Sequence, residues 1–413
     1  MIQQTQKTLE LTVRASYGRL LAYLKAQSLD LAMIEDALSD SLMAALETWP
    51  KKGVPPNPEA WLLVTARRKL IDGYRRSKVH EATEETLKFL TSQIQEQDVM
   101  IQSHFPDHRL KLLFVCAHPA IDPNVRTPLM LQTILGFNAK QIAEAFLVSP
   151  VSISQRLVRA KSKIQSSGIR FEIPEEKELP ERLDSVLEAI YAAYNHGWHD
   201  FSGVDEKSAN FREEAIWLAR LCAKLLPNQA EAQGLLALIL FCESRYKARI
   251  SDKGVYIPLS EQDTNLWQKS LIEEAEQILK AAAEKKQIGH FQLEAAIQSV
   301  HSERYKTGKI NERVLLNLYE ALLQFAPFTG AFVACASAEG QFKGPQEGLK
   351  RLEEIPEAEV SDYQPYWAVK ANLLKSLGRH LEAKHAYLKA IVLTKEPFLK
   401  SFLEGELLKL NLK

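Results

Sequence analysis

The sequence predicts an all-α protein, and three observations support that prediction. Apolar residues recur at the i, i+3, i+4 and i+7 spacing of an amphipathic helix in many segments, among them 213–226, 232–244 and 271–286. No segment has the period-two alternation that predicts a strand. The composition, with 46% hydrophobic and 25% charged residues, is that of an ordinary globular chain, which excludes disordered and collagen-like proteins.

The length of 413 residues predicts two to three domains at about 150 residues each. The four cysteines lie far apart and form no CxxC pair, so we expect buried or idle thiols rather than disulfides or a zinc site. No apolar run reaches the roughly 18 residues of a membrane span, and the N-terminus has no apolar signal core. We therefore expect a cytoplasmic protein with no membrane partner.

Charge is balanced overall, with 52 basic and 52 acidic residues, but it is segregated along the chain. Residues 61–78 contain six basic residues and one acidic residue, and residues 120–170 contain seven basic and two acidic residues. Between these segments, 81–107 contains six acidic residues and one lysine. This pattern predicts a basic module at 8–80, an acidic linker at 81–107, a second basic module at 108–170 and a helical extension at 180–413.

The second module contains a predicted helix-turn-helix at 138–164. Ala139 to Phe146 would form its first helix, and the second would begin at the N-cap Ser149 with Pro150 in the first helical position. The turn position where such motifs usually carry Gly is Leu147, so we expect an altered turn. One face of the second helix is apolar. The other is polar and basic, and would present base-reading and phosphate-binding side chains to a major groove: Ser152, Ser154, Gln155, Arg156, Arg159, Lys161 and Lys163. The alternative is a solvated charged face on a packing helix.

The first module predicts three helices, at 11–24, 31–50 and from about residue 58 onward. Prolines at 50, 55, 56 and 58, together with Gly53, predict a stiff loop before the third helix. A rigid loop followed by a basic helix can hold a single strand of DNA, with the basic side chains along its backbone. Trp49 and Trp61 are expected in the core. The second helix carries an acidic patch, which by itself could be a solvated face: Glu35, Asp36 and Asp40.

Both modules together resemble an extracytoplasmic-function (ECF) sigma factor of the sigma-70 family. IEDALSDSL (34–42) resembles the helix that binds core RNA polymerase in the sigma-2 domain, and PPNPEAWLLVTARRKLIDGYRR (55–76) resembles the segment that melts and reads the −10 element. Residues 135–164 resemble the sigma-4 helix-turn-helix that reads the −35 element. The resemblance implies core RNA polymerase and promoter DNA as partners, polymerase contacts at Glu35, Asp36 and Asp40, and −10 contacts at Lys51, Lys52, Asn57, Arg67, Arg68, Arg75 and Arg76. Arg67 could instead pair with an acidic residue inside the module.

The resemblance continues into the extension. Residues 190–198, 211–227, 235–249, 259–267 and 289–301 resemble the helical C-terminal extension of one ECF subgroup. That likeness implies a regulatory role, with a protein partner or a signal acting there. Near the C-terminus, residues 364–397 have the spacing of a tetratricopeptide repeat, in which small and aromatic residues let two helices approach: Trp367, Ala371, Gly378, Ala383, Tyr387 and Ala390.

No enzyme motif is present, and we expect no catalytic residue, metal or cofactor. The sequence has no Walker loop, HExxH, GxSxG or GxGxxG. His196 and His199 have a spacing that could ligate a metal, but they are better explained as residues of a helix junction. Two other functions stay open: an autonomous helix-turn-helix regulator whose extension senses a ligand or partner, and a tetratricopeptide scaffold without a DNA role.

Overall fold

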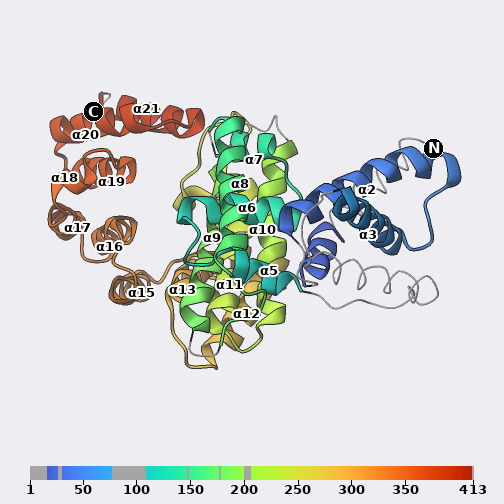
Figure 1. Ribbon diagram of the computed structural model, residues 1–413. Helices are drawn as coiled ribbons and strands as arrows, with labels where there is room; N and C mark the ends of the chain where they lie inside the picture. Colours follow the sequence, from blue (N-terminus) through green and yellow to red (C-terminus); the bar gives the residue numbers. More distant parts are fainter. Residues whose placement is uncertain are drawn as a thin grey trace. The chain divides into compact units, whose positions relative to one another are not determined.

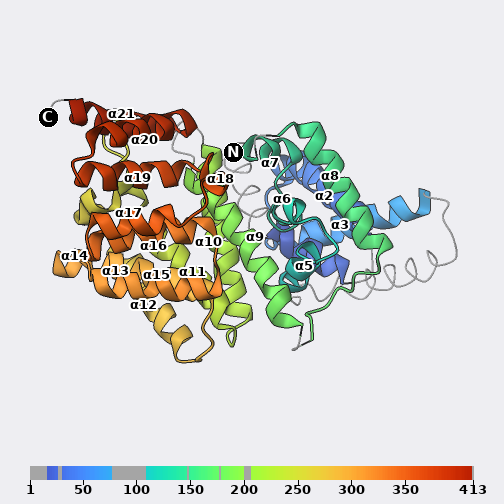
Figure 2. The same ribbon diagram turned by 90° about the vertical axis from the view of Figure 1, so that its left-hand side faces the viewer.

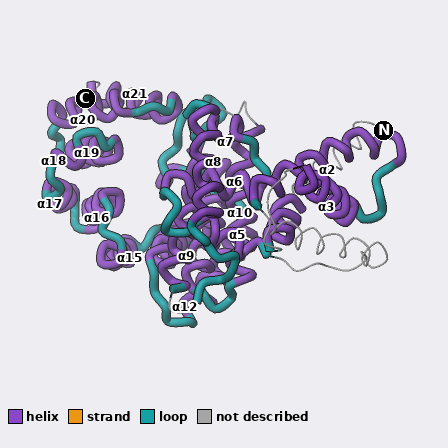
Figure 3. Tube along the Cα trace, viewed as in Figure 1, coloured by secondary structure: helices purple, strands orange, loops and turns teal. Residues whose placement is uncertain are grey.

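The computed structural model describes residues 16–26, 30–76, 108–146, 148–175, 178–199 and 206–411. Within these ranges the regular structure is helical, apart from an isolated antiparallel bridge between Ile250 and Tyr256. Figure 3 shows helices joined by loops, with no strand drawn in the described part. The all-α prediction is confirmed. The predicted acidic linker at 81–107 and the turn residue Leu147 lie outside the described residues.

The chain divides into two units of packed helices, Met1–Ala215 and Ile216–Lys413. The first unit begins with a helical segment at 16–25. The helices that follow are labelled in Figure 1: α2 (Leu31–Lys52), α3 (Pro58–Arg76), α5 (Arg109–Cys116), α6 (Pro123–Leu135), α7 (Ala139–Ala145), α8 (Pro150–Ser166) and α9 (Leu179–His199). The next helix, α10 (Glu206–Leu225), contains the boundary between the units.

The first group of helices is built around α2 and α3, which pack along each other. Asp30 caps α2 by accepting a hydrogen bond from the Met33 amide at 3.0 Å, and Gly53, with φ of 86°, ends the helix. Trp49 is buried, and its ring meets the Trp61 ring edge to face with 5.5 Å between centroids. Trp49 is a core residue, as predicted, whereas Trp61 packs against it and is only half-buried.

The second group contains α5 to α8, and α9 belongs with it. Arg182 of α9 donates to the Phe114 carbonyl of α5 at 3.0 Å. The Thr127 hydroxyl of α6 donates to the Ala189 carbonyl of α9 at 3.2 Å. The sequence placed residues from 180 onward in the extension, whereas the structure packs α9 against the second basic module. The helical pattern located α9 but carried no signal for its partner.

The second unit is a succession of helices in which each packs mainly on its neighbours along the chain. Figure 2 shows α15 to α21 stacked in this way. Three short 3₁₀ helices interrupt the chain after α11: Tyr246–Arg249, Leu259–Glu261 and Thr264–Leu266. The α-helices are α11 (Ala230–Ser244), α12 (Lys269–Ala283), α13 (His290–Ser302), α14 (Arg304–Thr307), α15 (Glu312–Phe325), α16 (Thr329–Phe342), α17 (Pro345–Glu353), α18 (Glu357–Val360), α19 (Gln364–Ser376), α20 (His380–Leu393) and α21 (Pro397–Asn411).

The helix pair expected at 364–397 is present as α19 and α20. Its turn contains Gly378 with φ of 73°, and the three alanines at 371, 383 and 390 are completely buried. A second pair of closely packed helices, α16 and α17, was not predicted from the sequence. A Cβ added to Gly348 would lie 2.6 Å from the Gly340 Cα and 2.7 Å from the Ala336 carbonyl oxygen, so position 348 requires a glycine. The two pairs bring helices together with different small residues.

The pH dependence of stability in the second unit should respond to His301 on α13. Burial, together with the positive charges of Arg245 and Arg304, lowers the pKa of His301 to about 4. An unfolded chain takes up this proton near the ordinary pKa of 6.5. The folded chain takes it up only near 4, so the free energy of unfolding falls as the pH drops through this interval.

We expect His301→Gln to reduce the loss of stability between about pH 7 and about pH 5, measured by urea unfolding at both values. His385 is exposed on α20, and His385→Gln provides the control that should follow the wild-type pH dependence. An unchanged pH dependence in His301→Gln would contradict the lowered pKa.

Candidate nucleic-acid interface

The helices α7 and α8 are each started by a side-chain cap. Asn138 and Gln141 exchange hydrogen bonds between side chain and backbone, both at 2.9 Å, at the beginning of α7. The Ser149 hydroxyl accepts a hydrogen bond from the Ser152 amide at 3.1 Å, and Pro150 is the first residue of α8. The predicted cap of the second helix is confirmed. The first helix ends at Ala145, one residue earlier than predicted.

The two faces of α8 divide as the sequence predicted. Its apolar stripe is buried, and consists of Ile153, Leu157, Ala160 and Ile164. Ser152 is half-buried, and the exposed face contains the other expected DNA-binding residues except Lys161: Ser154, Gln155, Arg156, Arg159 and Lys163. Val151 and Val158, each 66% exposed, add two apolar side chains that the sequence analysis did not consider.

The basic face of α8 lines a cavity of about 320 Å³ against the turn before α6. Arg156, Arg159 and Lys163 contribute the cationic lining, together with Asp122 on the opposite side. Asp122 is already engaged, because its carboxylate accepts hydrogen bonds from the Asn124 amide and side chain at 2.9 and 3.1 Å. Three cations around one cavity make a suitable seat for an anionic group such as a phosphate.

Lys161 differs from the other residues of this set. Its ammonium pairs with the Glu35 carboxylate of α2, and the two side chains are only 12% and 13% exposed. The pair joins a predicted DNA-binding residue to a predicted polymerase-binding residue. Burial raises the pKa of Glu35 above its ordinary value, although the Lys161 charge opposes that change. This contact joins residues 126 positions apart, and no local pattern in the sequence predicts it.

The remaining acidic residues of α2 lie on an exposed surface. Asp36 and Asp40 are exposed, and so are Met43 (58%) and Leu46 (45%) one to two turns further along the helix. Apolar side chains beside acidic ones are typical of a protein-binding surface. The acidic patch was predictable from the sequence, but its exposed apolar neighbours were not predicted.

Several expected −10 contacts are placed differently from the prediction. Lys51 and Lys52 belong to the last turn of α2 rather than to the loop, because the helix continues through Pro50 and ends with the Gly53 amide bonded to the Trp49 carbonyl. Asn57 caps α3, its side-chain oxygen accepting from the Ala60 amide at 3.0 Å. Both lysines and Asn57 are nevertheless exposed.

Arg67 does not face solvent, which corrects the expectation that it is presented to DNA. It is 1% exposed, its guanidinium lies 5.5 Å from the Tyr23 ring centroid, and it donates to the Tyr23 hydroxyl at 3.3 Å. Its neighbour Arg68 is exposed. Arg75 and Arg76 lie in the last turn of α3, and their side chains are outside the described part.

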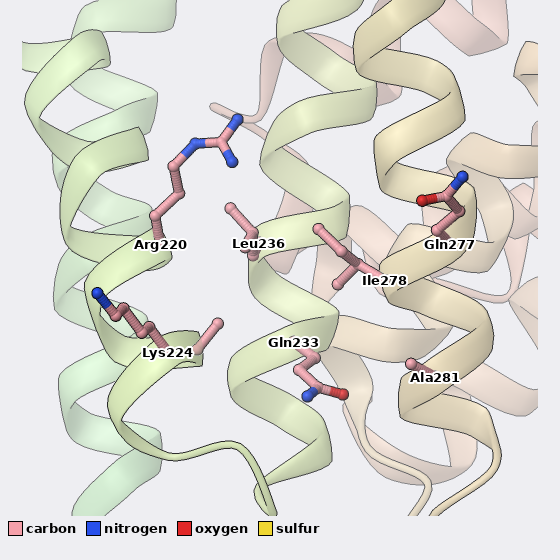
Figure 4. Close-up of a pocket in the computed structure, with 8 residues that line it drawn as sticks. Arg220, Lys224, Gln233, Leu236, Gln277, Ile278 and Ala281 are labelled. Atoms are coloured by element: carbon pink, nitrogen blue, oxygen red, sulfur yellow. The ribbon is translucent and has the colours of Figure 1, made fainter.

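The second unit contains a cavity of about 390 Å³ between α10, α11 and α12. Figure 4 shows Arg220 and Lys224 on one side of it and Gln277 and Ile278 on the other. Arg220 is held by Glu274, with 2.9 Å between Nη2 and Oε2. No residue expected to bind DNA or polymerase lines this cavity.

Within the described ranges, no group of three or more His, Cys, Asp or Glu side chains is arranged to hold a metal. The side chains of His196 and His199 lie outside the description. None of the helices in those ranges combines the length and apolarity that crossing a bilayer requires. All four cysteines are buried as free thiols.

Comparison with known proteins identifies the domain that contains α2 and α3. Residues 12–79 match the family described as Sigma-70 region 2. The first basic module is therefore a sigma-70 region 2 domain. Over 112 residues it is 29% identical to the ECF RNA polymerase sigma factor SigG of Mycobacterium tuberculosis (strain ATCC 25618 / H37Rv), covering 26% of this chain and 28% of SigG. The region 2 domain and the similarity to SigG support core RNA polymerase and promoter DNA as partners.

The extension is also shared with other proteins. Residues 182–283 match a family of unknown function, DUF6596. The whole arrangement is similar to Uncharacterized protein R00370 of Rhizobium meliloti (strain 1021), with 36% identity over 379 residues, 91% of this chain and 88% of that protein. No solved structure matches. The region 2 match contains every residue expected at the −10 and polymerase contacts, whereas α7 and α8 lie outside both family matches.

The cap of α8 yields a stability prediction. Ser149→Ala removes the acceptor for the Ser152 amide, and should reduce the free energy of unfolding by about 1 kcal/mol. Ser154→Ala, on the exposed face of the same helix, is the matched control and should change it by less than about 0.5 kcal/mol. Urea unfolding followed by circular dichroism measures both. Equal effects of the two changes would show that the Ser149 cap contributes nothing specific.

Proposed function

We propose that this chain is an ECF-type sigma factor that brings core RNA polymerase to specific promoters. The observation that carries the proposal is the exposed basic face of a capped α8, in the same chain as a sigma-70 region 2. In this proposal α7 and α8 form the helix-turn-helix of a sigma-4 domain that reads the −35 element. Catalysis then belongs to the polymerase, and this chain supplies base readout, phosphate neutralisation and a protein interface.

The proposed DNA contacts of α8 are of two kinds: some bind phosphates and position the helix, and others read the bases. Arg159 and Lys163 are long cationic side chains at the rim of the 320 Å³ cavity, where a phosphate of the duplex would be held. Ser154 and Gln155, in the first turns of α8, are short and polar and can approach base edges in the major groove. Arg156 lies between the two groups and can serve in either role.

On the sigma-2 side, core polymerase would dock on the exposed surface of α2 formed by Asp36, Asp40, Met43 and Leu46. Separated −10 DNA would follow the end of α2 and the start of α3, where Lys51, Lys52, Asn57 and Arg68 are exposed. Arg67 would support this surface from inside through Tyr23 instead of contacting DNA. The helical extension, whose α19–α20 pair is tetratricopeptide-like in its small-residue contact, would regulate or support this activity.

In vitro transcription with core enzyme and a promoter library tests the proposal as a whole. A sigma factor should make core RNA polymerase initiate from a definable −35/−10 consensus. A chain that binds a duplex promoter tightly alone, and fails to associate with core polymerase, would instead be an autonomous regulator.

The −35 contacts should be visible in the salt dependence of promoter binding. Replacing Arg156 and Arg159 by Ala should weaken holoenzyme binding and flatten its dependence on salt by roughly one unit of slope per lost phosphate contact. Arg170→Ala removes an exposed charge that pairs with Glu172, and serves as the control that should keep the wild-type slope. Filter binding over a series of salt concentrations gives the slopes, and an unchanged slope in the double variant would exclude phosphate contacts at both arginines.

The polymerase surface should depend on charge at the exposed acids of α2. Reversing Asp36 and Asp40 to Lys should lower the amount of core polymerase recovered in a pull-down by about tenfold or more, because like charges would then face the partner. Asp72→Lys on the exposed face of α3 reverses a charge elsewhere in the module, and should leave recovery unchanged. Full recovery with the double reversal would show that the surface lies elsewhere.

A further inference from the structure

The sigma-2 helices and the α5–α9 group are closely packed on each other within the first unit. A Cβ placed on Gly18, in the helical segment 16–25, would lie 2.2 Å from the Ile134 carbonyl oxygen of α6. A Cβ on Gly136, which ends α6, would lie 3.2 Å from the Tyr17 ring. Gly18 therefore allows a backbone approach that no other residue would permit. A contact this close is a specific interface between the two groups of helices.

The Glu35–Lys161 pair lies in the same region of the unit. Burial raises the pKa of the Tyr17 hydroxyl, and the nearby charge of Glu35 raises it further. Tyr17, whose ring lies against Gly136, is therefore a neighbour of the pair. The second oxygen of Glu35, Oε1, is buried and accepts no hydrogen bond from any described residue. The carboxylate is thus compensated by Lys161 while it remains incompletely solvated.

A buried ion pair adds little stability to an interface that never opens. The free-energy cost of removing two charges from water is only roughly offset by their attraction, and apolar residues of similar size often stabilise a permanent contact better. Charged residues are the better choice where the interface separates, because each charge then meets water or a polar partner. The chemistry of the pair therefore fits a contact that closes and opens.

We propose that Glu35 and Lys161 form a latch that keeps the free chain closed, and that this latch must open before core polymerase reaches Glu35 and DNA reaches Lys161. The inference rests on the proposed function, because only a sigma factor would use Glu35 for polymerase, as the family resemblance implies, and Lys161 for promoter DNA. In the closed state Glu35 of the polymerase surface and Lys161 of the DNA surface are bound to each other. The free chain is thereby held back from both partners by a single contact.

The rest of each surface stays available while the latch is closed. Asp36 and Asp40 are exposed on α2, and Arg156, Arg159 and Lys163 are exposed on α8. Polymerase can therefore make a first contact with the closed chain and then complete the interface as the latch opens. Opening for polymerase releases Lys161 at the same moment, so binding of polymerase favours binding of the −35 element.

The test measures the closed state without polymerase or DNA. Cysteines introduced at the exposed positions Lys69 on α3 and Gln165 on α8 carry spin labels, and the four native cysteines are buried. Pulsed electron–electron double resonance then gives the distribution of distances between the two spin labels, and so between the two groups of helices, in the full chain. We expect one narrow distribution for the wild type, and a broader distribution at longer distances for Lys161→Ala and for Gly18→Ala, which opens the interface without changing a charge.

Two further variants make the result specific. Arg170→Ala removes an equal charge from an exposed pair and should keep the narrow distribution. The double variant Glu35→Lys with Lys161→Glu should restore the narrow distribution. Each single reversal should give the broad distribution at longer distances. Circular dichroism of every variant confirms that the helices are retained, so that opening is separated from unfolding. A narrow, unshifted distribution in Lys161→Ala would overturn the latch.

The consequence for polymerase is measured separately. Lys161→Ala and Gly18→Ala should lower the apparent dissociation constant for core polymerase by about tenfold, because the competent open form no longer has to be selected from a minor population. Opening with no gain in affinity would overturn the masking of Glu35. If the wild type does not bind core polymerase at all, the proposed function fails, while the distance distributions still decide whether the latch exists.

Discussion

The buried pair of Glu35 and Lys161 connects two groups of helices that the sequence presents as independent basic modules. Each group has its own core: Trp49 and Trp61 join α2 to α3, and the apolar stripe of α8 is buried within the second group. The contacts that unite them include this ion pair, the close approach at Gly18, the Tyr17 ring against Gly136 and the stacking of Tyr23 on His108. Among these contacts, the ion pair is electrostatically balanced rather than strongly attractive.

Local signals predicted local structure well. The start of α8 was predictable because Ser149 and Pro150 act through neighbouring amides, and its two faces were predictable because helical periodicity fixes which side chains lie together. The helix pair α19 and α20 was predictable for the same reason, since its alanines recur at fixed spacings. In α16 and α17 the approach depends on Gly340 and Gly348, which follow no such repeat, so that pair was missed.

The incorrect predictions concern residues whose environment is set by a partner distant in the sequence, which no local pattern reveals. Arg67 is buried because Tyr23, 44 positions earlier, receives its guanidinium. Lys161 is buried because Glu35 lies opposite, and α9 joins the first unit because α5 and α6 satisfy Arg182 and the Ala189 carbonyl. Pro50 misled for another reason: a proline near the end of a helix removes one hydrogen bond, and the buried Trp49 beside it helps to keep that turn helical.

The position of α9 bears on how the extension can act. The segment matching the family of unknown function begins at residue 182, inside α9, and contributes that helix to the unit containing α8. Arg126 of α6 donates to Ser185 of α9 at 3.1 Å, and Ala192 of α9 lines a cavity of about 350 Å³ together with Ile153 and Arg156 of α8. A displacement of α9 would therefore act on the helix that carries the proposed −35 residues without passing through bound DNA or polymerase. Removing the extension at residue 182 would also leave the buried Thr127 hydroxyl without the Ala189 carbonyl, its acceptor on α9. The extension and the second basic module thus share α9 as a structural element, which is the physical reason to expect that a signal received by one alters the other.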